Sequence, residues 1–308
     1  MDASNFGKVA VLMGGQSAER EISLKSGVAV LNALTAKNIE ADAIDVGEDV
    51  FEKLRSGNYK RAFIALHGPM GEDGSIQGGL DVIGLPYSGS GVMASSICMN
   101  KVMTKQIWKG YQIPSPNFKV LTDTYDSDEL EKDLGLPMIF KPVSQGSSIG
   151  MTKVNSKEEI ASAWESAREF ENSVIAEQWV NGEEYTVTIL EDRALPIIRL
   201  ETPRTFYDFD AKYASNETKY HCPSGLPELL ETKVKELALR AFKVTEASGW
   251  GRVDVMLDKK QQPWFLEINT VPGMTDHSLV PMAAKAENIY FDELVVKILE
   301  TSMPKRSV

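Results

Sequence analysis

Cysteine and histidine are scarce in this chain. Its 308 residues contain two cysteines, Cys98 and Cys222, and three histidines. Two cysteines do not form a disulfide framework, and a pair of reduced thiols is typical of a cytosolic protein. Three scattered histidines offer little for a zinc site. We therefore expect a cytoplasmic protein that lacks a disulfide framework.

Long hydrophobic runs and an excess of basic residues are also missing. No apolar run approaches 18 residues, so no transmembrane helix is expected. The first residues lack the basic and apolar regions of a signal peptide. The 33 Lys and Arg against 44 Asp and Glu give a net charge of -11. This charge disfavours nucleic acids and anionic membranes as partners, because both are polyanions.

The first third of the chain alternates apolar runs with a helical pattern. Strands are expected over residues 8–13, 41–46 and 61–66, with a helix over 23–37. Strands separated by helices indicate a parallel sheet. Ligands of such sheets bind beyond the carboxyl ends of the strands, which is where Gly14-Gly15 and His67-Gly68 lie.

Two features divide the rest of the chain. A Gly/Ser-rich stretch over residues 84–96 marks one boundary, and Gly182 lies near a second. The part between them mixes expected strands and helices in an α+β pattern. At roughly 100–200 residues per domain, the length suggests two domains and allows three.

A predicted hairpin carries the most informative polar residues. Residues 250–258 and 263–269 both alternate apolar and polar side chains, as half-buried strands do. A tight turn centred between Lys260 and Gln261 would pair two residues of each strand and point all four side chains to one face. The pairs are Asp254 with Glu267 and Arg252 with Asn269.

This face has the composition of a metal site. Two carboxylates and an amide oxygen suit Mg²⁺, which keeps several waters and usually bridges to substrate phosphates. Arg252 could neutralise a phosphate or a developing oxyanion. The alternative is an exposed hairpin with ordinary salt bridges, which explains the Arg and Asp better than the additional Glu and Asn.

A loop of small residues, Gln145 to Gly150, is a candidate phosphate site. Backbone N–H groups in such a loop can cradle phosphate, although turns use the same residues. Lys141 lies just upstream and Lys101 begins a predicted helix. Neither this loop nor residues 14–19 match the Walker A or dinucleotide fingerprints. A strand is expected over residues 174–180, with Glu177, Trp179 and Val180 at its end. It could line a nucleotide base or simply bury an aromatic ring.

Taken together, seven segments resemble the D-alanine–D-alanine ligase family of the ATP-grasp superfamily. They occur in the family's order and cover essentially the whole chain. The segments are residues 14–24, 67–68, 89–94 with Lys101, 146–150, 206–213, 251–254 and 267–279.

The resemblance implies an α/β fold of three domains, with an N-terminal Rossmann-like parallel sheet and an α+β central part. The implied domains are residues 1–92, 93–182 and 183–308, with ATP between the second and third. The implied reaction phosphorylates one D-alanine and joins it to a second for peptidoglycan synthesis in the bacterial cytoplasm. Two Mg²⁺ or Mn²⁺ ions and a homodimer are expected, and the family allows K⁺.

The resemblance also assigns roles around the nucleotide. Asp254, Glu267 and Asn269 match the metal ligands. The residues that match the ATP contacts are Lys101, Lys141 and Lys212 at the phosphates, Ser147 and Ser148 in the loop, Glu177, Trp179, Val180 and Glu184 at the adenosine, and Ile139, Phe206 and Met256 against the base. Gln145 departs from the Glu that many members carry.

On the substrate side, Glu19 matches the anchor of the first ammonium group. Arg252 and the Gly273 N–H match the oxyanion donors, and Ser278 with the Leu279 backbone matches the carboxylate site of the second substrate. His67 is expected near the first substrate; alternatively it is a strand-end histidine bonded to the backbone.

Ser147 and Tyr213 are expected to form a network with Glu19 that closes residues 202–225 as a lid. Relatives that make D-alanyl-D-lactate carry Phe at the position of Tyr213, so Tyr favours an amine nucleophile. Two other functions stay open: another ATP-grasp carboxylate-amine ligase, and a nucleotide sensor without catalysis. A sensor would be expected to lose Arg252 or the metal ligands, which this chain keeps.

Overall fold

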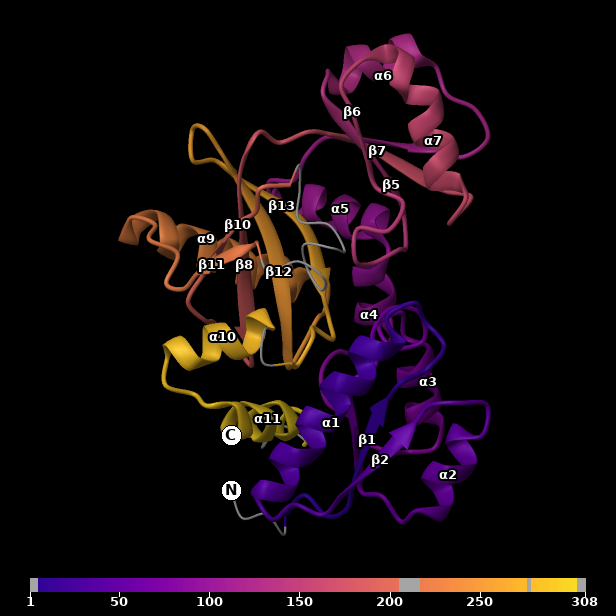
Figure 1. Cartoon of the computed structure of the whole chain (residues 1–308), viewed down its shortest axis with the longest axis vertical. Coiled ribbons are helices and arrows are strands. Elements are labelled where there is room, and N and C mark those ends of the chain that lie inside the picture. The colour runs from indigo at the N-terminus through magenta and orange to yellow at the C-terminus, as the bar shows by residue number, and fades with distance from the viewer. Residues whose placement is uncertain (1–4, 205–216, 276–277, 304–308) are drawn as a thin grey trace.

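Three β-sheets follow one another along a mixed α/β chain. The computed structural model describes residues 5–204, 217–275 and 278–303. The first sheet is parallel, and the other two are antiparallel. Figure 1 shows the first sheet at one end of the molecule, the second at the other, and the third beside the segment that connects them. No helix in the described stretches is long and apolar enough to cross a membrane.

The first sheet has the strand order β2-β1-β3. Its central strand β1 is apolar and buried along its whole length, as expected for a strand covered on both faces. The three predicted strands are confirmed, and the predicted helix begins three residues earlier, at Arg20. The elements are β1 (Val9–Met13), α1 (Arg20–Ala36), β2 (Ala41–Asp45), α2 (Val50–Ser56), β3 (Arg61–Ile64) and α3 (Ser75–Val82).

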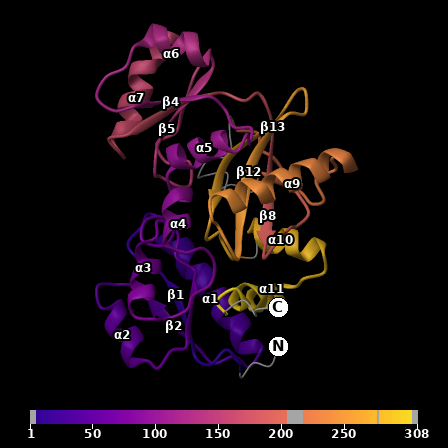
Figure 2. The ribbon, with the colours of Figure 1, turned by 180° about the vertical axis from the view of Figure 1, so that it is seen from behind.

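Helices from the C-terminal end share the core of this first sheet. They are α10 (Leu279–Ala286) and α11 (Phe291–Glu300). Leu294 and Ile298 of α11 are fully buried in the same hydrophobic cluster as Val11 of β1. Figures 1 and 2 both show α11 lying against α1. The two ends of the chain therefore stabilise each other through one core.

The second sheet is antiparallel and has the order β4-β7-β5-β6. Helices α4 (Val92–Met99) and α5 (Lys101–Gly110) lead into it from the first sheet. Its own helices supply Leu130 and Ile160 to a core around Phe140. The elements are β4 (Phe118–Leu121), α6 (Ser127–Leu134), β5 (Met138–Pro142), β6 (Thr152–Val154), the 3-10 turn η2 (Lys157–Glu159), α7 (Ile160–Arg168) and β7 (Val174–Gln178).

The third sheet has the order β11-β10-β8-β12-β13, with β9 paired to β8. Helix α9 packs on one face through Val234 and Phe242, which leaves the opposite face for the site (Figure 2). The elements are β8 (Gly182–Leu190), β9 (Arg193–Ala194), β10 (Ile198–Glu201), β11 (Lys219–His221), α9 (Glu228–Val244), β12 (Trp250–Asp258) and β13 (Pro263–Asn269). The predicted domain ranges stay predictions.

Strands β12 and β13 form the predicted hairpin with the predicted pairs. Asp254 lies opposite Glu267 and Arg252 opposite Asn269. The register then shifts, because Val255 pairs with Phe265 and Leu266 is left over as a bulge. A bulge bends a strand and redirects neighbouring side chains. The alternating pattern had predicted an uninterrupted ladder, since one extra residue near the turn leaves the rest of the pattern intact.

Candidate active site

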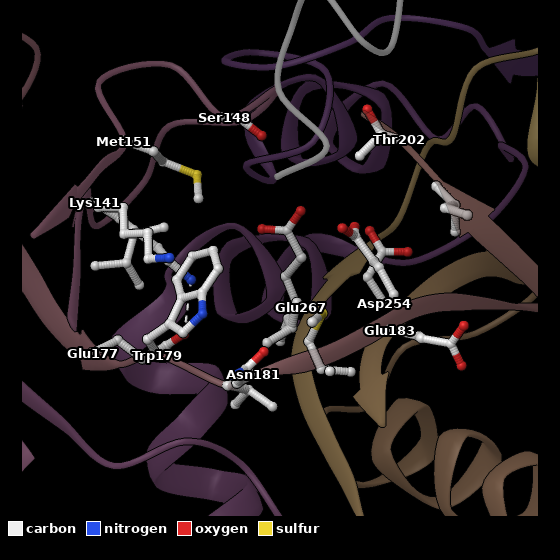
Figure 3. Close-up of a pocket in the computed structure, with 18 of the residues that line it drawn as sticks. Lys141, Ser148, Met151, Glu177, Trp179, Asn181, Glu183, Thr202, Asp254 and Glu267 are labelled. Atoms are coloured by element: carbon white, nitrogen blue, oxygen red, sulfur yellow. Dashed lines mark hydrogen bonds and ion pairs between the residues drawn. The ribbon is translucent and has the colours of Figure 1, made fainter. Parts of the chain in front are cut away.

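A cavity of about 600 Å³ lies between the second and third sheets. Ten of the predicted site residues line it: Ile139, Lys141, Ser148, Glu177, Trp179, Val180, Glu184, Asp254, Met256 and Glu267. Two lining residues, Thr202 and Arg204, belong to the predicted lid segment. Nine lining residues had no predicted role: Met151, Lys153, Gln178, Asn181, Gly182, Glu183, Leu200, Glu201 and Leu266. Figure 3 shows that Lys141, Trp179 and Glu267 project into this space from separate elements.

Apolar side chains line part of the cavity. Trp179 lies on the connection between β7 and β8, and Met151 faces the same space (Figure 3). Met256 and the bulged Leu266 add apolar surface from the hairpin. The ammonium of Lys153 lies 4.2 Å from the centre of the Trp179 ring, a cation–π contact that holds the indole in place.

Lysines gather on the side of the second sheet. Lys141 Nζ lies 2.7 Å from Glu177 Oε1, and Lys105 Nζ lies 2.7 Å from the other oxygen of the same carboxylate. Lys105 was not predicted to belong to the site. A signal for it exists in the sequence, because it follows Lys101 by four residues and so shares a face of helix α5.

The loop after β5 has the backbone of an anion site. Ser147 and Ser148 have φ of 51° and 60°, in the left-handed region that non-glycine residues rarely adopt. Such conformations turn successive N–H groups toward one side, and strain of this kind clusters at ligand sites. Lys101 Nζ donates to the Gln145 carbonyl at 2.6 Å. This contact uses the main-chain carbonyl of residue 145, so it can form whether the side chain there is Gln or Glu.

Asp254 is the centre of a polar network on the hairpin. Arg252 donates to both of its oxygens, from Nε and Nη2, at 2.8 Å each. Thr186 of β8 donates to it at 2.6 Å, and Asn269 Nδ2 at 3.1 Å. Thr186 was missed, because only the β8–β12 pairing reveals that it lies opposite Asp254. These bonds fix the carboxylate and the guanidinium in one orientation.

The oxygen-rich face fits a divalent cation by its donor chemistry. Asp254 and Glu267 are neighbours across the ladder, and Asn269 adds an amide to the same face. Among the described residues, no group of three or more His, Cys, Asp or Glu could hold a metal. Two carboxylates completed by an amide oxygen and waters still match the preferences of Mg²⁺ or Mn²⁺. Lys101 Nζ lies 3.6 Å from Glu267, on the phosphate-loop side.

Glu19 connects the first sheet to the phosphate loop. It is buried and directly precedes helix α1. The hydroxyl of Ser147 donates to Glu19 Oε1, across 128 positions of sequence. A Cβ added at Gly68 would lie 3.0 Å from Glu19 Oε2, so the glycine permits this close approach. The predicted Glu19–Ser147 contact is therefore present; Tyr213, its predicted third member, lies outside the described residues, as do Phe206 and Lys212.

His67 joins the first sheet to the loop after β13. Its Nδ1 lies 2.9 Å from the Val271 carbonyl and its Nε2 lies 3.1 Å from Ser26 Oγ. Ser26 Oγ also accepts from Met274 N. Burial lowers the pKa of His67, which favours a neutral ring that donates from Nδ1. The backbone contact of the alternative interpretation is thus present, and contact with substrate stays a prediction.

Glu72 is a second acidic group in this region that the sequence did not reveal. Its carboxylate accepts from Gly68 N at 2.8 Å and from Val271 N at 3.3 Å. It therefore ties the end of β3 to the loop that carries Gly273. Its position in the loop between β3 and α3 gave no sign of this contact.

Replacing Glu72 with glutamine is expected to change how the free energy of unfolding varies with pH. Burial raises the pKa of this carboxyl from 4.5 to about 8, and the charge of Glu19 adds to the effect. The folded chain then holds a proton that the unfolded chain releases, so wild-type stability falls as pH rises between these values. The variant lacks this group, so its free energy of unfolding should rise relative to that of wild type as the pH increases from 4.5 to about 8.

Urea unfolding at steps from pH 5 to pH 9 measures this difference. Glu48→Gln, at an exposed glutamate, is the control and should follow wild type at every pH. A constant difference between Glu72→Gln and wild type would mean that the folded chain does not hold the proton.

The Ser278 loop provides small polar groups at the start of α10. Ser278 Oγ accepts from Thr275 N at 2.8 Å and lies 2.9 Å from Thr275 Oγ1. Leu279 is the first residue of α10, so its N–H is one of the helix donors without an intrahelical partner. A Cβ at Gly273 would lie 3.0 Å from Ser278 Oγ, which shows how closely the two segments approach.

An apolar slot, a strained loop flanked by lysines and an oxygen-rich hairpin together define a nucleotide-dependent enzyme. Residues 107–300 match the family model described as the D-Ala-D-Ala ligase C-terminus, and residues 47–90 match the N-terminus of the same family. A curated D-alanine–D-alanine ligase from Nitrosococcus oceani is 56% identical over 306 residues, which is 99% of this chain and 97% of the relative.

Solved structures agree with this match. The D-alanine–D-alanine ligase of Bacillus anthracis complexed with ATP has a TM-score of 0.85 and 34% identity, over 96% of this chain and 97% of that one. A D-Ala:D-Ser ligase from Enterococcus faecalis has a TM-score of 0.84 and 27% identity, over 96% and 99%. The chain belongs to the D-alanine–D-alanine ligase family, and the predicted α/β fold of the ATP-grasp type is confirmed.

Proposed function

We propose that this chain joins two D-alanine molecules to D-alanyl-D-alanine, with ATP converted to ADP and phosphate, for peptidoglycan synthesis. One observation carries the proposal: the Ser147 hydroxyl binds Glu19, so the anion loop of the nucleotide cavity adjoins a buried carboxylate suited to an amino acid. A ligase that activates a carboxylate needs these two sites in contact, because the reacting oxygen must reach the terminal phosphorus.

In the first step the carboxylate of one D-alanine attacks the terminal phosphorus of ATP. A P–O bond forms, the bond to the ADP oxygen breaks, and D-alanyl phosphate results. Glu19 would hold the ammonium of this D-alanine by a charge-assisted hydrogen bond. Lys101 and Lys141, with the backbone of Ser147 and Ser148, would neutralise the phosphates.

In the second step the neutral amine of the other D-alanine attacks the carbonyl carbon of the acyl phosphate. A C–N bond forms and the carbonyl oxygen gains negative charge. The carbonyl is restored as phosphate leaves, and one proton of the nitrogen departs with the phosphate. Arg252 and the Gly273 N–H would stabilise that oxygen. Ser278 and the Leu279 N–H would bind the second carboxylate, as helix N-termini bind anions.

Asp254, Glu267 and Asn269 would hold Mg²⁺ or Mn²⁺, which when bound supplies charge neutralisation at the phosphates. Two such ions are part of the proposal, and K⁺ as an activator stays a prediction. The orientation of Asp254 comes from hydrogen bonds within the chain. Thr186 and Arg252 orient Asp254 independently of any ion, through three hydrogen bonds.

The proposal extends to a homodimer in the bacterial cytoplasm that binds neither nucleic acid nor membrane. The family resemblance supports the dimer. The net charge of -11 disfavours nucleic acids and anionic membranes as partners. Light scattering on the purified chain should give twice the chain mass, and the chain mass itself would contradict the dimer.

Phosphate release from Mg-ATP with D-alanine, L-alanine or D-lactate tests the proposal, with each product identified by mass. We expect release with D-alanine alone and D-alanyl-D-alanine as product. Turnover with another amino acid instead would indicate a different carboxylate-amine ligase. ATP binding without turnover on any of the three would support the sensor.

A further inference from the structure

A row of three buried charges lies behind the nucleotide cavity. Glu177 is shared by Lys141 and Lys105, one at each oxygen, with both N–O distances at 2.7 Å. Lys105 and Glu177 are each 1% exposed, and Lys141 is 6% exposed. Charges this far from water are present only when they are paired, so the three groups depend on one another.

Only two of the three groups reach the cavity. Lys141 and Glu177 line it, from β5 and β7 (Figure 3). Lys105 comes from α5 and lines a different cavity of about 660 Å³, beside Pro114 and Trp264. Lys105 therefore approaches the carboxylate from behind, where a nucleotide in the first cavity would not touch it.

The stoichiometry of this row decides how much charge Lys141 offers to a ligand. A single lysine paired with Glu177 would form a neutral pair, and its attraction for phosphate would be largely cancelled. A second lysine gives the row a net charge of +1. Because the interior screens charges far less than water, this difference acts strongly at the cavity wall.

The protonation of Glu177 is consistent with this charge count. Burial alone would raise the pKa of its carboxyl, but the charges of Lys105 and Lys141 outweigh it and the pKa is lowered. The pKa of Lys105 is lowered, chiefly by burial, although the charge of Glu177 opposes this shift. Glu177 is therefore the group that favours the charged form of Lys105.

We propose that Lys105 is a positioning residue for ATP: it balances Glu177 from behind, so that Lys141 presents its charge to the phosphates. The proposal rests on the proposed nucleotide role of the cavity. It concerns the affinity for the charged part of the nucleotide: Glu177, which the resemblance places at the adenosine, keeps its position in the row, and the D-alanine sites are unaffected.

Calorimetric binding of ATP, ADP and adenosine to Lys105→Met separates this role from simple packing. Methionine keeps most of the side-chain volume and removes the charge. We expect the Kd of ATP and ADP to rise about tenfold, or about 1.4 kcal/mol, and the Kd of adenosine to change less than about twofold. The KM of D-alanine should stay near the wild-type value.

Lys109→Met is the matched control, because Lys109 lies one turn further along α5 and is exposed. It should bind all three ligands like wild type. Equal weakening of adenosine and ATP by Lys105→Met would mean that Lys105 only supports the fold, and unchanged ATP binding would mean that it carries no charge toward the site. Either result overturns the proposal.

A double variant keeps the test valid if Lys105→Met folds poorly. Adding Glu177→Gln removes the carboxylate that has lost one of its two lysine partners and leaves Lys141 with its charge. The double variant should therefore recover part of the ATP affinity relative to that for adenosine, because Lys141 then faces the phosphates without an opposing carboxylate. ATP binding as weak as in Lys105→Met would overturn the proposal. Wild-type turnover with D-alanine is measured separately, so a failure of the proposed function is distinguishable from a failure of this inference.

Discussion

Replacing Asp254 with asparagine is expected to lower kcat about a thousandfold. The carboxylate accepts from Thr186, from both ends of the Arg252 fork and from Asn269. Asparagine keeps the shape but loses the charge, and its NH₂ group would oppose one of these donors. Arg252 would then lose the bidentate pair that aims it at the oxyanion, and the proposed metal would lose a ligand oxygen.

Steady-state phosphate release at saturating ATP and D-alanine measures this effect. Asp258→Asn is a matched control, since it makes the same change on the same strand, near the turn and away from the cavity. It should retain activity within about twofold, as substitutions away from a site do. If Asp254→Asn kept more than a tenth of wild-type kcat, neither the metal role nor the orientation of Arg252 by Asp254 would stand.

Replacing Glu19 with glutamine is expected to lower kcat/KM for D-alanine about a hundredfold, because a buried charge-assisted bond is worth about 1.5–3 kcal/mol. The variant would face the substrate ammonium with a neutral amide. It would also weaken the bond from Ser147, which holds the anion loop against the first sheet. The loss should fall mainly on the first D-alanine, as a raised KM.

Initial-rate kinetics over a range of D-alanine concentrations, with calorimetric ATP binding alongside, separates these effects. Glu21→Gln, at an exposed position of the same helix, serves as the control and should be unchanged. Equal losses of ATP and D-alanine binding in Glu19→Gln would indicate a collapsed loop and would contradict a specific role for Glu19 at the ammonium.

Period-two and helical patterns predicted much of the fold. The hairpin of β12 and β13 was predicted with its bounds and its two polar pairs, because alternation fixes which side chains share a face. The bulge at Leu266 was missed, since the pattern on either side of it is unbroken. The packing of α11 on the first sheet was also missed, because amphipathic periodicity indicates a buried face but not its partner.

In the site, too, local patterns indicated some residues and missed those that act through distant contacts. Lys101, Lys141 and the carboxylates of the hairpin stand in recognisable local segments, so the sequence indicated them. Lys105 and Glu72 act through contacts with residues far along the chain, Glu177 and Val271. Such contacts arise only when segments far apart in the sequence come together, and single-sequence patterns carry no information about that assembly.

Transfer of oxygen-18 from D-alanine to phosphate tests the central claim most directly. The claim is that ATP activates the carboxylate of one D-alanine before the second amine attacks. With both carboxylate oxygens labelled, that route places one labelled oxygen in each phosphate released and leaves one in the new peptide carbonyl. Mass spectrometry of the phosphate should therefore find one oxygen-18 atom per dipeptide formed. Unlabelled phosphate accompanying dipeptide would contradict an acyl phosphate and the account built on it.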